Sequence, residues 1–315
     1  MPRLPVIPGS EPVNRPTGRR LPPWLKRPLP AGHTFTHTRR AVARSGVATV
    51  CQEARCPNLT ECWSAGTATF MVLGDRCTRR CHYCAVTTAR PAPPESDEPE
   101  RLARAVAELG LRHVVITAVA RDDLPDEGAG HFARCVTCIN ESRPQATVEV
   151  LPADFHARPE CIRVLCDARP EIYNHNIETV ERLTPLVRPQ ARYHRSLDVL
   201  RLVKRTAPDM LTKSGLMIGL GESDEEIIRT FEDLRGAGCD VLTVGQYLQP
   251  SAQHVAVARF YQPEEFDKLA RVAEGLGFLS VASGPFVRSS YNAAGVFEQT
   301  TRARARRSGG TPRAV

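Results

Sequence analysis

The sequence lacks the long apolar segments of membrane and secreted proteins. No stretch approaches the roughly 20 apolar residues of a membrane span, and residues 1–20 contain no apolar core of a secretory signal. An even number of cysteines is also missing. Since the sequence has 11 cysteines, they cannot all pair in disulfides within one chain. We therefore expect a cytoplasmic protein without membrane association, in which clustered cysteines bind metal or take part in catalysis rather than form disulfides.

A strong excess of one charge is absent as well. The 42 Lys and Arg against 35 Asp and Glu give a formal net charge of +7, a mild bias that favours acidic partners without selecting one. Nucleic acid, an acidic protein domain and a phosphorylated ligand all fit this charge. The length of 315 residues and the hydrophobic content of 42% are sufficient for one large domain or two ordinary ones with a sizeable core.

Both ends of the sequence lack the pattern of a regular helix or strand. Residues 1–30 carry nine prolines together with basic pairs, and residues 302–315 are rich in Arg, Ser and Gly with almost no apolar side chains. We expect the first segment to wrap over or trail from the surface. We expect the second to be disordered, since it cannot bury enough apolar area to offset the entropy of ordering.

Between these ends, strands and helices alternate. The helical segment 99–109 repeats apolar residues at helical spacing, Ser223 and Glu226 form the pattern of a capping box, and Pro263 suits a helical first turn. Alternating strands and helices predict parallel pairing through right-handed crossovers, hence an α/β fold with a partial (β/α)6 TIM-type barrel. An open doubly wound sheet is the alternative. The expected strands are 68–74, 113–119, 148–154, 172–178, 214–220, 241–248 and, more weakly, 278–286.

Six cysteines stand in two groups of three. The first group is Cys51, Cys56 and Cys62, and the second is Cys77, Cys81 and Cys84. Three thiolates on a four-iron cluster leave one iron open to bind and cleave a cofactor. Zinc is the rival metal, since it also takes thiolates and His82 lies within the second group. The second group follows the first expected strand, at the edge where barrels and doubly wound sheets bind ligands.

The other five cysteines show no ligand spacing that completes a site. Cys135 and Cys138 are spaced like a metal or redox pair, but they lie in the helical stretch 131–141 with nothing to complete a site. We expect these five residues to be small buried hydrophobes. The set is Cys135, Cys138, Cys161, Cys166 and Cys239.

Specific motifs carry a resemblance to a known family. Cys77-Thr-Arg-Arg-Cys81-His-Tyr-Cys84 resembles the signature of radical S-adenosylmethionine enzymes. The preceding group from Cys51 to Cys62, and the sequence Arg288-Ser-Ser-Tyr291, resemble the auxiliary-cluster motif and the closing motif of lipoyl synthases. The resemblance covers about residues 22 to 292. Four segments are then expected: a Pro-rich basic extension (1–40), an auxiliary-cluster segment (41–67), the barrel (68–286) and a C-terminal segment (287–315).

The resemblance implies two [4Fe–4S] clusters and S-adenosylmethionine as cofactors. The second cysteine group would bind the cluster that cleaves S-adenosylmethionine to a 5′-deoxyadenosyl radical. The first group would bind an auxiliary cluster that donates two sulfur atoms to C6 and C8 of a protein-bound octanoyl-lysine. Ser290 would be the fourth ligand of the auxiliary cluster, with Ser289 as the alternative, so the end of the chain should fold back over the cysteines.

Further site residues are implied less directly. Gly215, Met217, Gly219 and Glu222 resemble the motif that packs near the adenine in radical enzymes of this type; a strand ending in a glycine turn explains the same residues structurally. Buried structural roles or ligand contact are both open for Asn174, His175 and Asn176. For Arg121, contact with cofactor or substrate is weighed against a solvated loop.

The resemblance also implies partners. These are octanoylated lipoyl-carrier domains (the E2 subunits of 2-oxoacid dehydrogenases and the H protein of glycine cleavage), a ferredoxin or flavodoxin as electron donor, and an iron–sulfur carrier that reloads the auxiliary cluster. No nucleic acid and no membrane are expected. The rival functions are another sulfur-inserting radical enzyme, such as biotin synthase or a tRNA methylthiotransferase, and a non-enzymatic zinc or cluster scaffold.

Overall fold

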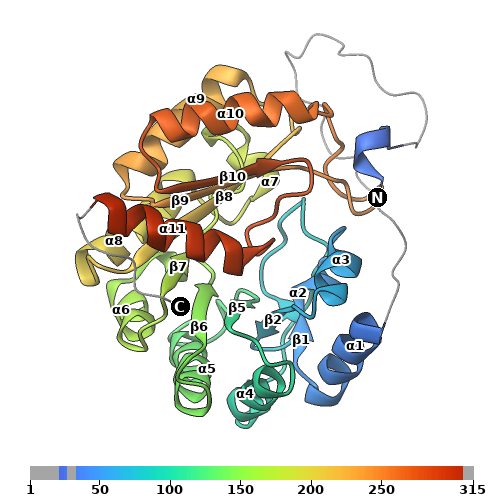
Figure 1. Cartoon of the computed structure of the whole chain (residues 1–315), viewed down its shortest axis with the longest axis vertical. Helices are drawn as coiled ribbons and strands as arrows, with labels where there is room; N and C mark the ends of the chain where they lie inside the picture. Colours follow the sequence, from blue (N-terminus) through green and yellow to red (C-terminus); the bar gives the residue numbers. More distant parts are fainter. Residues whose placement is uncertain (1–20, 27–32, 308–315) are drawn as a thin grey trace.

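A single large sheet surrounded by helices organises the chain. The computed structural model describes residues 21–26 and 33–307. The helices are α1 (His33–Ser45), α2 (Val50–Glu53), α3 (Leu59–Ser64), α4 (Glu98–Glu108), α5 (Ala129–Ser142), α6 (Pro159–Asp167), α7 (Thr184–Val187), α8 (Tyr193–Thr206), α9 (Asp224–Gly236), α10 (Pro263–Gly275) and α11 (Ala293–Arg307). Figure 1 shows α4, α5, α6, α8, α9 and α10 around the strands. Over the described ranges, none of them has the length and apolarity that crossing a bilayer demands.

The main sheet has eight strands in the order β1-β2-β5-β6-β7-β8-β9-β10. All neighbours from β2 to β10 pair in parallel, and β1 is antiparallel to β2. Strand order follows chain order without a reversal, which excludes the doubly wound alternative. The strands are β1 (Ala48–Thr49), β2 (Thr69–Val72), β5 (His113–Ala118), β6 (Thr147–Leu151), β7 (Ile172–Asn174), β8 (Leu211–Ile218), β9 (Val241–Gln246) and β10 (Ser280–Gly284).

The sheet is therefore a partial barrel, as predicted. Within the described residues β1 and β10 do not pair with each other, so the barrel stays open along that side. All seven predicted strands are present, and the parallel series runs through β10, the run expected to be weakest. Parallel strands bring their carboxyl ends to one edge, and the loops at that edge carry the candidate site.

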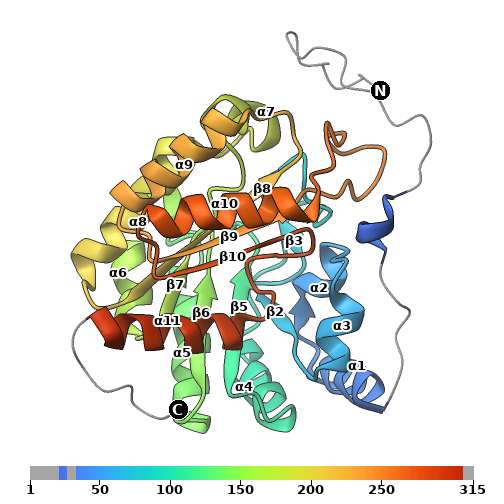
Figure 2. The ribbon, with the colours of Figure 1, turned by 45° about the horizontal axis from the view of Figure 1, so that its top comes forward.

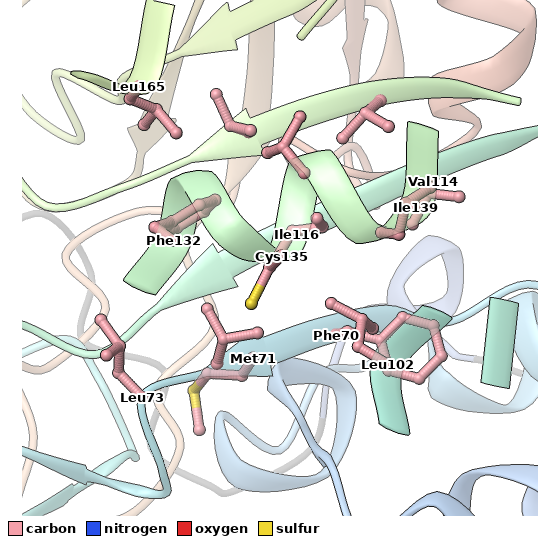
Figure 3. Packing of buried hydrophobic residues seen from close by; sticks show 14 of the residues in the cluster. Phe70, Met71, Leu73, Leu102, Val114, Ile116, Phe132, Cys135, Ile139 and Leu165 are labelled. Atoms are coloured by element: carbon pink, nitrogen blue, oxygen red, sulfur yellow. The ribbon is translucent and has the colours of Figure 1, made fainter. Parts of the chain in front are cut away.

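The core lies between the strands and the outer helices. One buried cluster joins β2, β5 and β6 to α4, α5 and α6, and a second joins β8 and β9 to α9 and α10. Figure 3 shows Phe70, Ile116 and Phe132 packed in the first cluster, with the sulfur of Cys135 among them. Cys135, Cys161, Cys166 and Cys239 are all buried, as predicted, whereas Cys138 is half-buried.

The helix signals of the sequence are confirmed. Ser223 accepts from the amide of Glu226 and the Glu226 carboxylate accepts from the amide of Ser223, which completes the capping box of α9. Pro263 is the first residue of α10, where its missing N–H costs no hydrogen bond. The segment expected at 99–109 forms α4.

The C-terminal segment corrects one prediction. Disorder was expected over 302–315, yet α11 continues to Arg307. The Arg304 guanidinium donates to the backbone oxygen and to the carboxylate of Asp209, and Arg307 donates to the Gly277 oxygen. Basic side chains thus anchor a helix end that has little apolar area. Residues 308–315 lie outside the described residues.

The amino-terminal prediction is tested only in part. Most of the expected Pro-rich segment lies outside the described residues, and Pro23–Leu25 form a single 3-10 turn. Helix α1 runs from His33 across the boundary expected at residue 40. Figures 1 and 2 show α1, α2 and α3 together at one side of the barrel, beside β1 and β2.

Helix α11 covers the end of the barrel at which the parallel strands begin. It contacts both β10 and β5, and Phe297 stacks on His113 at the start of β5 with ring centroids 5.3 Å apart. Phe297 is also buried with Ile172 and Leu211, the first residues of β7 and β8. The amino-terminal ends of the strands are thereby covered, so ligands must approach the opposite edge.

Candidate active site

Cys77, Cys81 and Cys84 lie in one loop at the carboxyl edge of the sheet. Cys77 ends β3 (Arg76–Cys77), which pairs in parallel with β4 (Thr87–Thr88) on the far side of the loop. The Cys77 sulfur accepts hydrogen bonds from the amides of Arg79 (3.4 Å) and Ala120 (3.3 Å). Two main-chain donors therefore fix the position of this sulfur.

The rest of this loop is fixed to three other parts of the barrel. The amide of Thr78 donates to the Ala120 oxygen after β5, and the amide of His82 donates to the Val187 oxygen at the end of α7. The amide of Val255 in turn donates to the His82 oxygen. A loop held by main-chain bonds on several sides presents its sulfurs in a fixed arrangement.

Arg79 is the main side-chain anchor of the cysteine loop. Its side chain is 6% exposed, and its guanidinium donates to both oxygens of Asp122 and to Asp154 at 2.8 Å. Asp154 also accepts from Arg195 at 2.8 Å. Burial would raise the pKa of Asp122 and of Asp154, but the charge and hydrogen bonds of Arg79 outweigh this and hold both pKa values below their usual range. The loop is therefore tied to the ends of β5 and β6 by a buried ion-pair network.

The three thiols of the barrel loop do not form the tight group of ligand atoms that one metal ion requires. In the described part of the chain, the one group of three or more potential ligand atoms that all lie within 4.8 Å of one another is Asp122, Glu127 and His156. The cysteine sulfurs are thus spread more widely than ligands of one zinc ion. Burial raises the pKa of Cys81 to about 11 and that of Cys84 to about 12, so these thiols need a bound metal to ionise at neutral pH.

The group of Asp122, Glu127 and His156 is itself part of the ion-pair network around Arg79. Arg79 lies 3.8 Å from the Glu127 carboxylate, and Arg158 approaches it at 3.7 Å. The two guanidinium groups therefore supply the positive charge that faces these carboxylates.

Cys51, Cys56 and Cys62 form a separate site outside the parallel strands. Cys51 is buried in α2, Cys62 lies in α3, and Cys56 stands in the connection, where its amide donates to the Cys51 oxygen at 3.0 Å. Burial raises the pKa of Cys51, and the neighbouring Cys56 adds to the effect. The two thiols are therefore close enough to interact.

The C-terminal segment returns to this site, as expected. The amide side chain of Asn58 donates to the Phe286 oxygen at 2.6 Å, and the Tyr291 hydroxyl donates to the Glu61 carboxylate at 2.7 Å. Gly245 makes the return possible: a Cβ there would lie 2.0 Å from the Val287 oxygen. Figures 1 and 2 show the segment between β10 and α11 passing beside α3.

The two serines of this segment differ in their partners. The Ser289 hydroxyl accepts from the Asn176 side chain at 2.6 Å, which turns it toward β7. Ser290 is half-buried. Since Ser289 is already engaged, its contact supports Ser290 as the fourth ligand of the first cysteine group, and this assignment remains a prediction.

The residues expected to contact the adenine form a turn after β8. Glu222 accepts from the amides of Gly219 and Leu220 and from the Tyr261 hydroxyl. Gly219 has φ +104°, and a Cβ there would lie 2.1 Å from the Gln246 side chain, so the turn requires glycine. Gly215 and Met217 lie on β8 itself. The turn is explained by its own contacts, and the adenine contact stays a prediction.

Arg121 and Asn174 are held in internal contacts. Arg121 is 1% exposed and donates to Asp123 and to the Leu73 oxygen, so it does not lie in a solvated loop. The Asn174 amide donates to Glu149, which also pairs with Lys213 at 2.9 Å inside the barrel. Asn174 Oδ1 accepts no hydrogen bond from a described residue. It is therefore a free acceptor toward the barrel interior, whereas the contacts of Arg121 are structural.

The sequence reasoning missed Arg79, Glu178 and the Glu149–Lys213 pair. Arg79 stands inside the second cysteine group, so its position between two ligands was the available signal. Glu178 ends the expected strand 172–178, and Lys213 stands directly before the expected strand 214–220. For Glu149, a single carboxylate in an apolar strand pattern was the only signal.

Comparison with known proteins agrees with this geometry. A family model described as the radical SAM superfamily matches residues 71–234, and one described as the N-terminal domain of lipoyl synthase matches residues 9–56. Lipoyl synthase from Desulfotalea psychrophila is 52% identical over 283 residues, 90% of this chain and 95% of that one. Lipoyl synthase from Halalkalibacterium halodurans is 51% identical over 275 residues, 87% of this chain and 91% of that one.

A solved structure shows the same fold at low sequence identity. Streptococcus suis SuiB bound to precursor peptide SuiA gives a TM-score of 0.54 at 12% identity, over 68% of this chain and 48% of that one. This likeness supports the partial barrel alone. On the two family models and the identity over nearly the whole chain, the protein belongs to the lipoyl synthase family, whose members are sulfur-inserting radical S-adenosylmethionine enzymes.

Proposed function

We propose that the chain inserts two sulfur atoms, at C6 and C8, into an octanoyl group bound to a lysine of a carrier protein. The observation that carries this beyond family membership is the docking of the segment 286–291 on α3, through Asn58 and Glu61. It brings the Arg288–Tyr291 motif to a second cysteine site next to the barrel. A radical enzyme with one cluster would not need that closure.

The protein contributes position and shielding to this reaction. When bound, the cluster at the second cysteine group and S-adenosylmethionine supply the radical that removes hydrogen from an unactivated carbon. Cys77, Cys81 and Cys84 would hold that cluster, and the Arg79 network keeps their loop against β5 and β6. Asn174 and Asn176 each present an unpartnered Oδ1 near this edge, as acceptors for ligand N–H or O–H groups.

The first cysteine group would hold the sulfur-donating cluster, with Ser290 as fourth ligand. A hard serine oxygen holds iron less firmly than thiolate does, which suits a site that releases sulfur in each turnover. Burial of Cys51 and the return of the C-terminal segment would shield this cluster from solvent.

The partners follow from the reaction class. The substrate is a protein-bound octanoyl group. We propose the E2 subunits of 2-oxoacid dehydrogenases and the glycine cleavage H protein as its carriers, a ferredoxin or flavodoxin as electron donor, and an iron–sulfur carrier for reloading. The net charge of +7 favours transient docking of acidic proteins. A cytoplasmic location belongs to the same proposal.

The test is an anaerobic reaction of the reconstituted chain with S-adenosylmethionine, a reductant and an octanoyl-lysine peptide. Mass spectrometry should show a product carrying two additional sulfur atoms. Iron analysis should give about eight irons per chain for two clusters. A product without sulfur, or bound zinc in place of iron, would contradict the proposal.

A further inference from the structure

One asparagine lies between the two cysteine sites. Asn176 follows β7, and its Nδ2 donates to Ser289 Oγ at 2.6 Å and to Glu178 Oε1 at 3.0 Å. Its Oδ1 accepts no hydrogen bond from a described residue, although the residue is only 8% exposed. A buried acceptor without a donor is costly, so this oxygen is suited to a ligand that brings one.

Glu178 extends the connection to the second cysteine group. Its carboxylate lies close enough to Tyr83, the residue between Cys81 and Cys84, and to Arg288 for both side chains to act on its pKa. A chain of side chains therefore runs from Tyr83 through Glu178 and Asn176 to Ser289. Hydrogen bonds join Glu178 to Asn176 and Asn176 to Ser289, and proximity links Tyr83 to Glu178.

Two glycines leave little freedom to this arrangement. A Cβ on Gly215 would lie 2.8 Å from Asn176 Oδ1, and a Cβ on Gly245 would lie 2.0 Å from the Val287 oxygen. Both the asparagine and the C-terminal segment thus sit directly on the strand backbones of β8 and β9. The hydrogen-bonded pair Asn176 and Ser289 therefore has little room to move relative to β8 and β9.

We propose that Glu178, Asn176 and Ser289 are positioning residues that couple the two cluster sites, so that the ligand bound beside Asn176 sets how firmly Ser290 is held at the auxiliary site. This inference rests on the proposed function, and it takes S-adenosylmethionine as the ligand whose N–H or O–H group binds Asn176 Oδ1. The carboxamide is planar, so a donor that fixes Oδ1 also fixes Nδ2 and, through it, Ser289. Ser289 and Ser290 share a peptide bond, which carries the effect to the ligand.

Coupling of this kind is reciprocal. If S-adenosylmethionine strengthens the hold of Ser290 on the auxiliary cluster, the filled auxiliary site must strengthen S-adenosylmethionine binding by the same factor. The inference therefore makes a prediction about equilibrium binding, which can be measured without turnover.

The experiment compares S-adenosylmethionine affinity in proteins with and without the auxiliary cluster. The fully reconstituted chain should bind about tenfold more tightly than Cys56→Ala, which keeps only the other cluster. In a Ser289→Ala background this difference should vanish, and Ser289→Thr, which keeps the hydroxyl, should restore it. Ser283→Ala is the matched control, because the Ser283 hydroxyl donates to the Phe266 oxygen and has no contact with Asn176. It should keep the full difference.

A second readout guards against local misfolding of Cys56→Ala. Mössbauer spectra of the auxiliary cluster should change when S-adenosylmethionine is added to the wild-type chain and stay constant in Ser289→Ala. A difference in affinity that persists in Ser289→Ala, or its absence in the wild-type chain, overturns the coupling. Loss of the auxiliary irons from Ser289→Ala also overturns it, because Ser289 would then be the ligand. Failure of the proposed function would instead appear as the absence of sulfur-containing product from the wild-type chain.

Discussion

The two cysteine groups are held by different kinds of structure. Cys77, Cys81 and Cys84 belong to one short loop that hydrogen bonds and a buried arginine tie to the barrel on several sides. Cys51, Cys56 and Cys62 are carried by two short helices and the connection between them, outside the parallel strands, and residues 286–291 contact this region. One site is completed by its own loop, and the other needs a distant part of the chain.

This difference matches the proposed roles. A cluster that is used again in every cycle benefits from a loop that cannot move, since its open position must stay aligned with the cofactor. A cluster that gives up sulfur must lose a ligand and regain it. A closure made of a few hydrogen bonds can open without disturbing the barrel.

The largest effect is expected from Cys81→Ala. Removing one of three thiolates should abolish S-adenosylmethionine cleavage and leave about four irons per chain, those of the auxiliary cluster. Formation of 5′-deoxyadenosine, followed by chromatography, is the measurement. Cys138→Ala, a half-buried cysteine of α5, is the control and should keep both clusters. Retained cleavage in Cys81→Ala would show that the two groups have been assigned to the wrong roles.

Cys56→Ala should separate the two functions. We expect 5′-deoxyadenosine to form while no lipoyl product appears, because the barrel loop makes none of its contacts through Cys56. Both products can be quantified in the same reaction by mass spectrometry. Sulfur-containing product from this variant would contradict the sulfur-donor assignment.

Replacement of Arg79 should lower the free energy of unfolding, because Arg79 anchors the loop that carries Cys77, Cys81 and Cys84. Arg79→Met leaves the partly exposed Asp122 without its guanidinium partner and leaves the buried Asp154 with Arg195 alone, so the cost should be at most that of a broken buried ion pair, about 3–5 kcal/mol. The free energy of unfolding in denaturant measures this loss. Arg80→Met, at the exposed neighbouring position, should cost less than about 0.5 kcal/mol. If Arg79→Met and Arg80→Met lower the free energy of unfolding equally, Arg79 does not anchor the cysteine loop.

The barrel site should also make the chain sensitive to acid. Burial, followed by the charge of Arg188, lowers the pKa of His175 to about 4 from its ordinary 6.5. The unfolded chain therefore binds this proton first, so the contribution of neutral His175 is complete above pH 6.5 and is lost as the pH falls toward 4. The loss is about 3 kcal/mol in the free energy of unfolding. His175→Gln should flatten the fall in the free energy of unfolding between pH 6.5 and 4. An unchanged fall in this variant would show that His175 does not cause the acid sensitivity.

The smallest effect should come from Tyr291→Phe at the closure of the auxiliary site. Losing the hydrogen bond to Glu61 should cost about 1.5 kcal/mol, which corresponds to about tenfold faster loss of auxiliary iron to a chelator. Tyr193→Phe loses a similar bond, to Asp233, on the outside of the barrel. It should leave the rate of iron loss unchanged. If both variants lose iron equally fast, the closure is not specific to the auxiliary site.

The sequence predicted the elements of the fold well because their signals are local. Strands and helices alternate in the expected places, since apolar periodicity depends on neighbouring residues alone. Strand β8 nevertheless begins at Leu211 rather than 214, because Thr212 and Lys213 are buried polar residues that interrupt the apolar pattern. Helix α11 was not predicted, and its last turns were expected to be disordered, because arginines bound to Asp209 and Gly277 take the place of an apolar face there.

The site was predictable where motifs are compact and unpredictable where contacts cross the barrel. The two cysteine groups were found from spacing, and the return of the chain end followed from the motif at 288–291. The partners of Glu149 lie on other strands, and the partners of Arg79 and the Ser289 partner of Asn176 lie in loops that follow other strands, so no spacing in one sequence reveals them. Arg121 shows the opposite case, because it was expected to contact a ligand or lie in a solvated loop, and its contacts with Asp123 and Leu73 are structural.

The docking of residues 286–291 on α3 has a consequence for synthesis of the chain. Ribosomes deliver the amino-terminal cysteines first, and Ser290 follows Cys62 by more than 220 residues. All six cysteines leave the ribosome long before the segment that closes the auxiliary site exists. The segment around α3 can therefore be closed only after the whole barrel has been synthesised, and a prematurely terminated chain would carry all six cysteines without that closure.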